Sequence, residues 1–407
     1  KEIIIMNFYD FIFENSSKGD IAIVFGNEKI NYVSLKKRIK LQSEKFNVYK
    51  KNYIVITENS PIEAIVDFFA AILCKKKPVL VNSNVQINNW EVISKELQKN
   101  NEDLFGLFTS GTTGEPKLVM YSNEAVVENC LYLAKISNVR IGINELVLFP
   151  FSSLAAMFFQ ILPTLMHSGT IFYTNGLDYL SDYDKLSFDF SLMTPSLFSI
   201  IHKKSPGFFK NTRAILLGGE PIDFEVIKKF SQHYSDSEII IGYSLTEAGR
   251  ILAMGNILEL PMGSTGKITS EKDVRIVTTN NQSYGEIQFY SYNKKVWVGT
   301  GDIGYIKDNY LFVIDRMDNM IKSSGKKIYL NAIKEKILNI KGIEDVNVYR
   351  FKSLQGHSVG VEIISNLTEE ETIEQIKVVL NESELPKKIK FVKEFSLSYQ
   401  GKKVFLK

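Results

Sequence analysis

Cysteine and histidine are scarce in this chain. Its 407 residues include two cysteines, Cys74 and Cys130, and four histidines. Two cysteines are too few for a disulfide framework, and neither lies at metal-ligand spacing from a histidine. We therefore expect both cysteines to be reduced, as in a cytoplasmic protein, and we expect no zinc site.

An excess of charge of one sign is also missing. Lys and Arg total 49 and Asp and Glu total 46, which gives a net charge of +3. The two signs are intermixed, so no basic patch suggests a nucleic-acid partner. The lysine run at 75–77 is predicted to be a solvated face. We expect no nucleic acid among the partners.

Charge is absent from one stretch, residues 146–166, which is long enough to span a membrane. Two prolines and several polar residues interrupt it, so we predict a buried strand at 146–151 followed by a buried helix, and no membrane span. The apolar run at 3–6 is short and acidic residues follow it. We therefore expect no signal peptide.

The composition, 44% hydrophobic and 23% charged, is that of a globular protein with a large core and more than one lobe. Short apolar strands alternate with helical patterns up to about residue 257, which predicts an α/β fold of parallel-rich sheets covered by helices. Residues 258–317 are typical of a small antiparallel β subdomain. From 318 to 407 the pattern predicts a small C-terminal α+β domain, which the family resemblance given below implies is a mobile lid, so the large domain spans 1–317.

Two predicted strands end in turns that could meet a ligand. The strand at 213–217 ends at Gly218-Gly219-Glu220, and the strand at 239–241 runs into Gly242-Tyr243-Ser244-Leu245-Thr246-Glu247. Ligands of open α/β sheets bind at the carboxyl ends of the strands. We therefore expect these turns to converge on one site.

A loop rich in glycine and hydroxyl groups follows a predicted strand that begins near residue 104. It reads Thr109-Ser110-Gly111-Thr112-Thr113-Gly114 and is followed by Lys117. Glycines let backbone N–H groups turn inward, and the hydroxyls and Lys117 add donors, which suits a polyphosphate. An ordinary surface turn has a similar composition, and the spacing is not that of the common nucleotide-triphosphatase loop.

The string FTSGTTGEPK resembles the phosphate-binding signature of the adenylate-forming (AMP-binding) superfamily, which contains acyl- and aryl-CoA synthetases, adenylation domains of peptide synthetases, and luciferases. Four further elements follow in the family's order: GGE at 218–220, GYSLTE at 242–247, TGD followed by Arg316, and a terminal Gly401-Lys402. Unrelated turns would have to imitate all of these in sequence. Asp315 departs from the pattern, because the family has glycine before the arginine.

The resemblance implies a role for each matched residue. The loop 109–114 and Lys117 would hold the phosphates of ATP, and Gly218, Gly219, Glu220 and Tyr243 would line the adenine. Thr246 would reach a phosphate, Glu247 would hold Mg²⁺, and Asp302 and Arg316 would bind the ribose. Lys402 would be the catalytic lysine, acting with Thr246 and Glu247, and Asp318 would be the hinge between the domains.

The acid substrate of the family binds near the segment that here contains Ser153, Leu154 and Met157, together with Gly242. Amino-acid-activating members have an aspartate in this segment, and this chain has Leu154. A buried ammonium without a partner is costly, so an apolar fatty or aryl acid is favoured. Ser153 stands where many acyl- and aryl-CoA synthetases have histidine.

The implied reaction is ATP-dependent, AMP-forming activation of a carboxylic acid and its transfer to a thiol. The acceptor would be coenzyme A or the phosphopantetheine of a carrier protein, which would then be a partner. Two alternatives stay open: an amino-acid-activating domain, and a non-catalytic nucleotide-binding regulator. The second is suggested by a first hundred residues that are short for the family.

Overall fold

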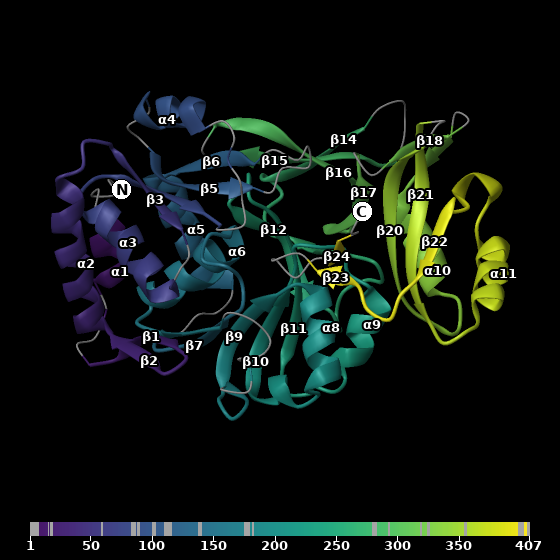
Figure 1. The fold of residues 1–407 in the computed structure, drawn as a ribbon, viewed down its shortest axis with the longest axis horizontal. Helices are drawn as coiled ribbons and strands as arrows, with labels where there is room; N and C mark the ends of the chain where they lie inside the picture. Colours follow the sequence, from purple (N-terminus) through teal and green to yellow (C-terminus); the bar gives the residue numbers. More distant parts are fainter. Residues whose placement is uncertain are drawn as a thin grey trace.

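The computed structural model describes residues 8–14, 16, 19–57, 60–82, 87, 90–99, 103–109, 116–136, 141–174, 180, 183–278, 283–291, 294–317, 320–323, 326–353, 356–397 and 403–404. The described residues fold into two lobes of unequal size (Figure 1). The larger is built on two sheets, and the smaller holds the C-terminal sheet. None of the described helices is long and apolar enough to cross a membrane.

A four-stranded sheet forms one layer of the large lobe. Its strands β3 (Tyr53–Thr57), β4 (Lys77–Val81) and β5 (Asp103–Thr109) are parallel, and β6 (Lys117–Ser122) runs antiparallel to β5. The helices of this region are α1 (Phe8–Phe13), α2 (Tyr32–Asn47), α3 (Pro61–Leu73), α4 (Trp90–Lys99) and α5 (Asn123–Ile136). Helix α3 begins at a proline, which is favoured at a first helical position, and is buried along most of its length.

A thirteen-stranded sheet forms the second layer, in the order β14-β15-β16-β17-β13-β12-β11-β10-β9-β7-β8-β1-β2. The strands are β1 (Ile21–Phe25), β2 (Glu28–Asn31), β7 (Asn144–Val147), β8 (Thr170–Tyr173), β9 (Phe188–Met193), β10 (Thr212–Leu217), β11 (Glu238–Leu245), β12 (Arg250–Asn256), β13 (Gly266–Ile268), β14 (Val274–Thr278), β15 (Gly285–Ser291), β16 (Val296–Lys307) and β17 (Tyr310–Arg316). Its helices are α6 (Leu154–Ala156), the π-helix η1 (Met157–Ile161), α7 (Leu162–Met166), α8 (Pro195–Lys204), the 3₁₀ helix η3 (Phe208–Asn211) and α9 (Phe224–Ser231).

The large sheet changes character along its width. The strands from β1 and β8 to β11 are parallel, and the pairings from β11 to β14 are antiparallel. Strand β7 lies between β8 and β9, so the chain turns to opposite sides of β7 on successive crossovers. Such a switch point is where ligands of open α/β sheets bind. One continuous apolar core joins both sheets through helices α1, α2, α3 and α7.

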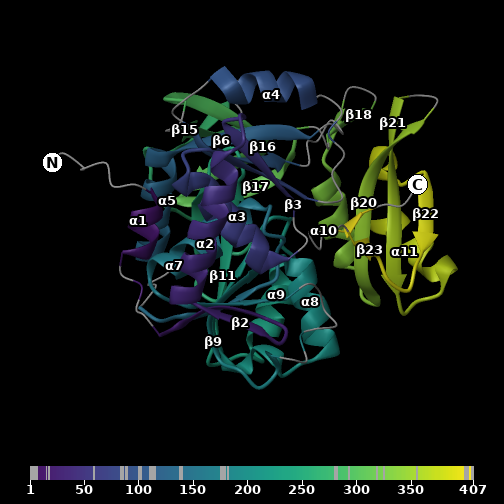
Figure 2. The same ribbon diagram turned by 60° about the vertical axis from the view of Figure 1, so that its left-hand side comes forward.

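The small lobe has its own sheet and core. Strands β20 (Ile343–Ser353), β21 (Gly356–Ser365) and β22 (Lys388–Phe391) pack against α10 (Leu330–Leu338) and α11 (Glu369–Val379). The short elements are β18 (Ile321–Ser323), β19 (Lys326–Ile328), η4 (Glu382–Glu384), β23 (Ser396–Leu397) and β24 (Lys403–Val404). In Figures 1 and 2 the β23–β24 ribbon lies on the side of this lobe that faces the large sheet.

Most predicted strands are confirmed, but three details are wrong. The strand expected at 146–151 is β7, which ends at Val147, because Pro150 has no N–H for a ladder. Strand β11 continues to Leu245, past the turn that was expected to begin at Gly242. Lys77 is buried and not solvated, and its Nζ donates to Leu97 O at 2.8 Å.

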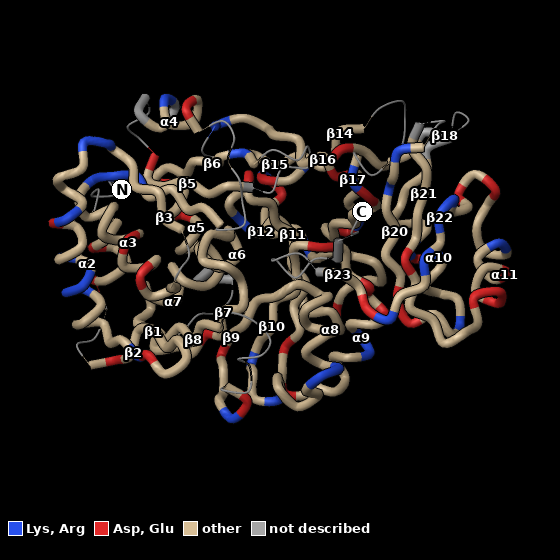
Figure 3. The backbone as a smooth tube through the Cα atoms, viewed as in Figure 1, with Lys and Arg blue, Asp and Glu red and all other residues tan. Residues whose placement is uncertain are grey.

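Charged residues of both signs are interspersed along the described chain (Figure 3). The predicted buried helix in the uncharged stretch is confirmed as the continuous helical segment α6–η1–α7. The expected division into domains at 317/318 stays a prediction. The described strands of 258–317 pair into the large sheet itself, through β13 and β12.

Candidate active site

Two strand ends meet closely at the carboxyl edge of the large sheet. Strand β10 ends at Leu217 and is followed by Gly218 and Gly219, of which Gly219 has a positive φ of 84°. A Cβ at Gly218 would lie 2.7 Å from Gly242 O, so the close approach of the two strands requires glycine. Backbone atoms therefore form the surface of this turn, as expected for a surface against which the flat adenine ring would lie.

Glu220 has a structural task in the same turn. Its Oε1 accepts a hydrogen bond from Ser196 N at 2.5 Å, in the first turn of α8. Helix N-termini carry unsatisfied N–H groups and favour a negative charge. Glu220 thus fixes the turn to helix α8, and the adenine role implied for it stays a prediction.

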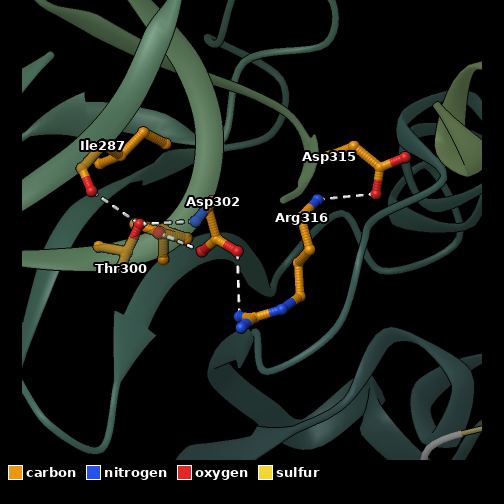
Figure 4. Close-up of polar contacts among 6 residues, drawn as sticks. Ile287, Thr300, Asp302, Asp315 and Arg316 are labelled. Atoms are coloured by element: carbon orange, nitrogen blue, oxygen red, sulfur yellow. Dashed lines mark hydrogen bonds and ion pairs between the residues drawn. The ribbon is translucent and has the colours of Figure 1, made fainter. Parts of the chain in front are cut away.

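Asp302 accepts hydrogen bonds from two residues that are predicted to bind the nucleotide. Its Oδ2 accepts from the Tyr243 hydroxyl, and its Oδ1 accepts from Arg316 Nη1 at 3.1 Å. Asp302 and Arg316 are opposite each other in the β16–β17 ladder, and Figure 4 shows the arginine reaching across to the carboxylate. Three residues far apart in the sequence thus form one polar cluster.

The backbone around Asp302 is also held in place. Thr300 Oγ1 donates to Ile287 O at 2.8 Å and accepts from Asp302 N at 2.9 Å. Gly301 has a φ of 73°, and a Cβ there would lie 3.2 Å from Arg316 Nη2. A side chain at this position would therefore crowd the guanidinium. The TGD sequence is explained by the space and the hydrogen bonds that this corner needs.

Burial keeps the Tyr243 hydroxyl neutral. Desolvation, and then the negative charge of Asp302, raise the pKa of Tyr243 well above its usual value. The hydroxyl is therefore a donor at all physiological pH values. Asp302 is 5% exposed, and Arg316 is partly exposed. The cluster has a buried acceptor and a cationic edge open to solvent, which suits a ribose or an α-phosphate.

Thr246 and Glu247 lie in the hairpin turn 246–249 that joins β11 to β12. Gly249 closes the turn with a φ of 68°. The buried Tyr121, on β6, donates from its hydroxyl to Thr246 O at 2.5 Å. Glu247 is exposed, and its charge contributes, after burial, to a raised pKa of Tyr121. An exposed carboxylate beside a phosphate site has the donor chemistry that Mg²⁺ prefers.

The segment after β7 forms the predicted acid side of the site. Ser153 caps helix α6 by accepting from Ala156 N at 3.1 Å. Leu154 and Met157 are buried, and Met157 begins a π-helical turn, a feature that often marks functional sites. A Cβ at Gly242 would lie 2.9 Å from Leu216 Cδ1, so no larger residue fits there without movement. Residues 148–166 carry no charge.

The phosphate loop is described only at its two ends. Thr109 is the last residue of β5, and it pairs with Lys117, the exposed first residue of β6. Ser110, Gly111, Thr112, Thr113 and Gly114 lie outside the described residues, as do Asp318 and Lys402. The β5–β6 hairpin nevertheless brings the loop's return strand to the Thr246 turn through Tyr121.

Sequence reasoning missed two residues of this region, Tyr121 and Asp315. Nothing in the sequence distinguishes Tyr121 from an ordinary strand tyrosine. Asp315 did carry a signal, because it replaces the family's glycine, but its partner lies in another lobe.

The sequence model of the AMP-binding enzyme family matches residues 39–289. This chain belongs to that family. The predicted membership of the adenylate-forming superfamily is thereby confirmed, and the solved structure described below confirms the α/β fold class.

The chain is 27% identical over 334 residues to the 2-succinylbenzoate–CoA ligase of Listeria monocytogenes serotype 4b, covering 73% of this chain and 67% of that protein. It is 25% identical over 334 residues to the long-chain-fatty-acid–CoA ligase FadD13 of Mycobacterium tuberculosis, covering 74% of this chain and 66% of that protein. These alignments span about two thirds of the relatives' length.

A solved structure of the O-succinylbenzoate coenzyme A synthetase of Bacillus subtilis, in complex with ATP and magnesium ion, has the same fold. The TM-score is 0.79 at 17% identity, and the superposition covers 97% of this chain and 98% of the other. Both lobes are therefore part of a known arrangement, including the small C-terminal one.

Proposed function

We propose that the protein is an AMP-forming acid–thiol ligase, which activates a carboxylic acid with ATP and transfers the acyl group to a thiol. The observation that carries this proposal is the buried Asp302 carboxylate, which accepts from both Tyr243 and Arg316 at the carboxyl edge of the sheet. Membership of the AMP-binding family and CoA-ligase relatives support it.

The nucleotide would bind along one line of residues. Adenine would lie against Gly218–Glu220 and Tyr243, ribose against Asp302 and Arg316, and the phosphates against Thr246 and the loop 109–114 with Lys117. The exposed Glu247 fits a Mg²⁺ ligand, since magnesium prefers one or two carboxylates plus phosphate oxygens. When bound, Mg²⁺ would supply charge neutralisation of the phosphates.

The chemistry needs positioning and electrostatics and no nucleophilic side chain. The substrate carboxylate oxygen attacks the α-phosphorus, the bond to the β-phosphate oxygen breaks, and pyrophosphate leaves. Lys402 and Arg316 would stabilise the charge that builds on the α-phosphate oxygens. A thiolate then attacks the acyl carbon, forms the thioester and releases AMP.

The acid is proposed to be an apolar aryl or fatty acid. The uncharged segment 148–166 follows β7 at the switch point of the sheet and offers no partner to an ammonium group. Glu145, on β7 itself, accepts from the Thr164 hydroxyl, and burial raises its pKa to about 8. It is therefore neutral near pH 7 and does not serve as an ammonium partner. An amino-acid substrate is disfavoured.

Coenzyme A is the proposed acceptor, because the relatives are named as CoA ligases. A phosphopantetheinyl carrier protein is the alternative acceptor, which direct assay with both thiols would distinguish. The two free cysteines support a reducing, cytoplasmic setting as part of the proposal.

The test is acid-dependent exchange of labelled pyrophosphate into ATP, over aryl, fatty and amino acids. We expect exchange with at least one apolar acid, and a large loss with Asp302→Asn as the matched variant. Exchange with amino acids alone would contradict the apolar assignment. Nucleotide binding without exchange for any acid would overturn the ligase proposal in favour of a binding-only regulator.

A further inference from the structure

Asp315 is a buried carboxylate that the proposed chemistry does not use. It precedes Arg316, at the position where the resembled family has glycine, and none of its surface is exposed. Buried carboxylates are costly unless their oxygens are hydrogen-bonded. The partners of this carboxylate therefore indicate what it is for.

Both oxygens of Asp315 accept backbone N–H groups. Oδ1 accepts from Arg316 N at 2.7 Å, and Oδ2 accepts from Asn331 N at 2.9 Å. Figure 4 shows Asp315 pointing away from Asp302, to which Arg316 reaches, as expected because Asp315 and Arg316 are adjacent on strand β17. One carboxyl group thus contacts the residue that binds Asp302 and a residue of the small lobe.

The contact in the small lobe is the N-terminus of helix α10, which has no cap of its own. Tyr329 occupies the N-cap position and makes no side-chain cap hydrogen bond, and the first turn contains no acidic residue. Uncapped N–H groups and the helix dipole both favour a carboxylate at this end. Asp315 supplies the missing acceptor and charge from strand β17 of the large sheet.

This hydrogen bond joins two separate cores. Strand β17 belongs to the large sheet, whereas Leu330, Ile333 and Ile337 of α10 pack into the core of the small lobe. The predicted hinge residue, Asp318, lies between Asp315 and Asn331 in the sequence. Any rotation about the hinge that moves α10 away from β17 must break the contact.

The same face of α10 also has an opposing interaction. Partial desolvation of its carboxyl group, and then the negative charge of Asp223, the N-cap of α9, raise the pKa of Glu335, which lies at the exposed surface of α10. A like-charge pair disfavours the approach of the two lobes. The Asp315 contact therefore holds α10 against this like-charge repulsion.

We propose that Asp315 is a positioning residue that tethers helix α10 to the strand carrying Arg316, and so favours the lobe arrangement seen here. In that arrangement the β23–β24 ribbon, which flanks Lys402 in the sequence, faces the large sheet (Figures 1 and 2). The tether would therefore favour acid adenylation over thiol transfer. The tether proposal rests on the proposed function and on the predicted hinge at Asp318.

The catalytic test compares the two half-reactions in Asp315→Ala. We expect acid-dependent pyrophosphate exchange to fall about tenfold or more, as for loss of a hydrogen bond to a charged group. Thioester formation from supplied acyl-adenylate should change less than about twofold. An equal fall in both half-reactions would contradict the tether, because it would indicate simple damage to Arg316.

A second variant separates tethering from helix capping. Tyr329→Ser gives α10 a cap of its own. Combined with Asp315→Ala, it should restore thermal stability but leave the ratio of half-reactions shifted. Full restoration of that ratio would show that Asp315 acts only as a cap and would overturn the proposal.

A third measurement does not depend on activity. Val48 in the large lobe and Val378 in the small lobe are 76% and 78% exposed. Each is replaced by cysteine in a Cys74→Ser background and labelled with a nitroxide. Pulsed electron paramagnetic resonance then reports the distance between the two labels. We expect one narrow distance in the parent and a broadened distribution in Asp315→Ala. Identical distributions would overturn the tether even if no acid substrate is found, whereas absent exchange in the parent bears only on the proposed function.

Discussion

The nucleotide side and the acid side of the candidate site are built in opposite ways. On the nucleotide side, Asp302 accepts from Tyr243 and Arg316, and Thr300 holds the backbone of Asp302. On the acid side, residues 148–166 contain no charge, and Leu154 and Met157 are buried among apolar neighbours. In the proposed function, the first region would recognise the nucleotide through specific atoms, and the second would recognise the acid through shape and the absence of charge.

This contrast indicates where specificity can change. A polar cluster loses its function when one atom is removed, because its buried partners are then left unsatisfied. An apolar surface tolerates hydrophobic replacements of similar volume. Substrate choice can therefore vary within this fold while the nucleotide residues stay the same.

The largest effect is expected from Asp302→Ala. This substitution removes the carboxylate that accepts from the Tyr243 hydroxyl and from Arg316. Both donors therefore lose this hydrogen bond in the folded protein. We expect kcat/KM for ATP in pyrophosphate exchange to fall by about a hundredfold or more. Glu28→Ala, at an exposed ion pair with Arg38, is the control and should leave exchange unchanged. A fall of less than threefold would remove Asp302 from the nucleotide site.

A smaller effect is expected from Leu154→Asp, which gives the acid side the charge that it lacks. Burying a carboxylate beside an apolar substrate is unfavourable, so kcat/KM for apolar acids should fall by about ten- to a hundredfold. The KM for ATP should not move. Leu154→Met keeps the volume and should retain activity. If Leu154→Asp lowered ATP binding as much as acid use, the two sides would not be separate.

Tyr121→Phe should have a more modest effect. The ring packing against Phe158, at a centroid distance of 4.7 Å, is kept, and only the hydroxyl that bonds Thr246 O is lost. We expect the Mg²⁺ concentration for half-maximal exchange to rise severalfold, about the effect of one hydrogen bond. Tyr32→Phe, which removes a similar buried bond to Gly169 O, is the matched control and should leave the Mg²⁺ titration unchanged. If the Mg²⁺ concentration for half-maximal exchange changed equally in both variants, Tyr121 would not be needed to hold the turn that contains Thr246.

The smallest effect on activity is expected at Glu145, beneath the acid side, where the prediction concerns stability. Its pKa is raised by burial to about 8 in the fold from 4.5 in an exposed group, so the folded state keeps a proton that the unfolded state loses. Stability should therefore fall with rising pH between about 4.5 and 8, by up to about 1.4 kcal/mol per pH unit. In Glu145→Gln this slope should flatten, as measured by urea unfolding at several pH values. An unchanged slope would show that Glu145 is ionised in the fold.

Much of the fold was predictable, because strands such as Ile21–Phe25 and Thr170–Tyr173 are short apolar runs between turn residues. The polar side of the site was predictable too, since its residues stand in recognisable motifs. The contacts of Tyr121 and Asp315 were not, because each joins segments whose approach depends on tertiary packing. The burial of Lys77 was missed since a lysine run gives no sign of the carbonyl at Leu97.

The central claim is that this chain couples ATP cleavage at the α-phosphate to thioester formation on an apolar acid. The most direct measurement is the product balance of one reaction containing ATP, Mg²⁺, coenzyme A and the acid that supports exchange. The account predicts equal amounts of AMP, pyrophosphate and acyl thioester. Formation of ADP and phosphate, or of AMP without thioester with both coenzyme A and a carrier protein, would contradict it.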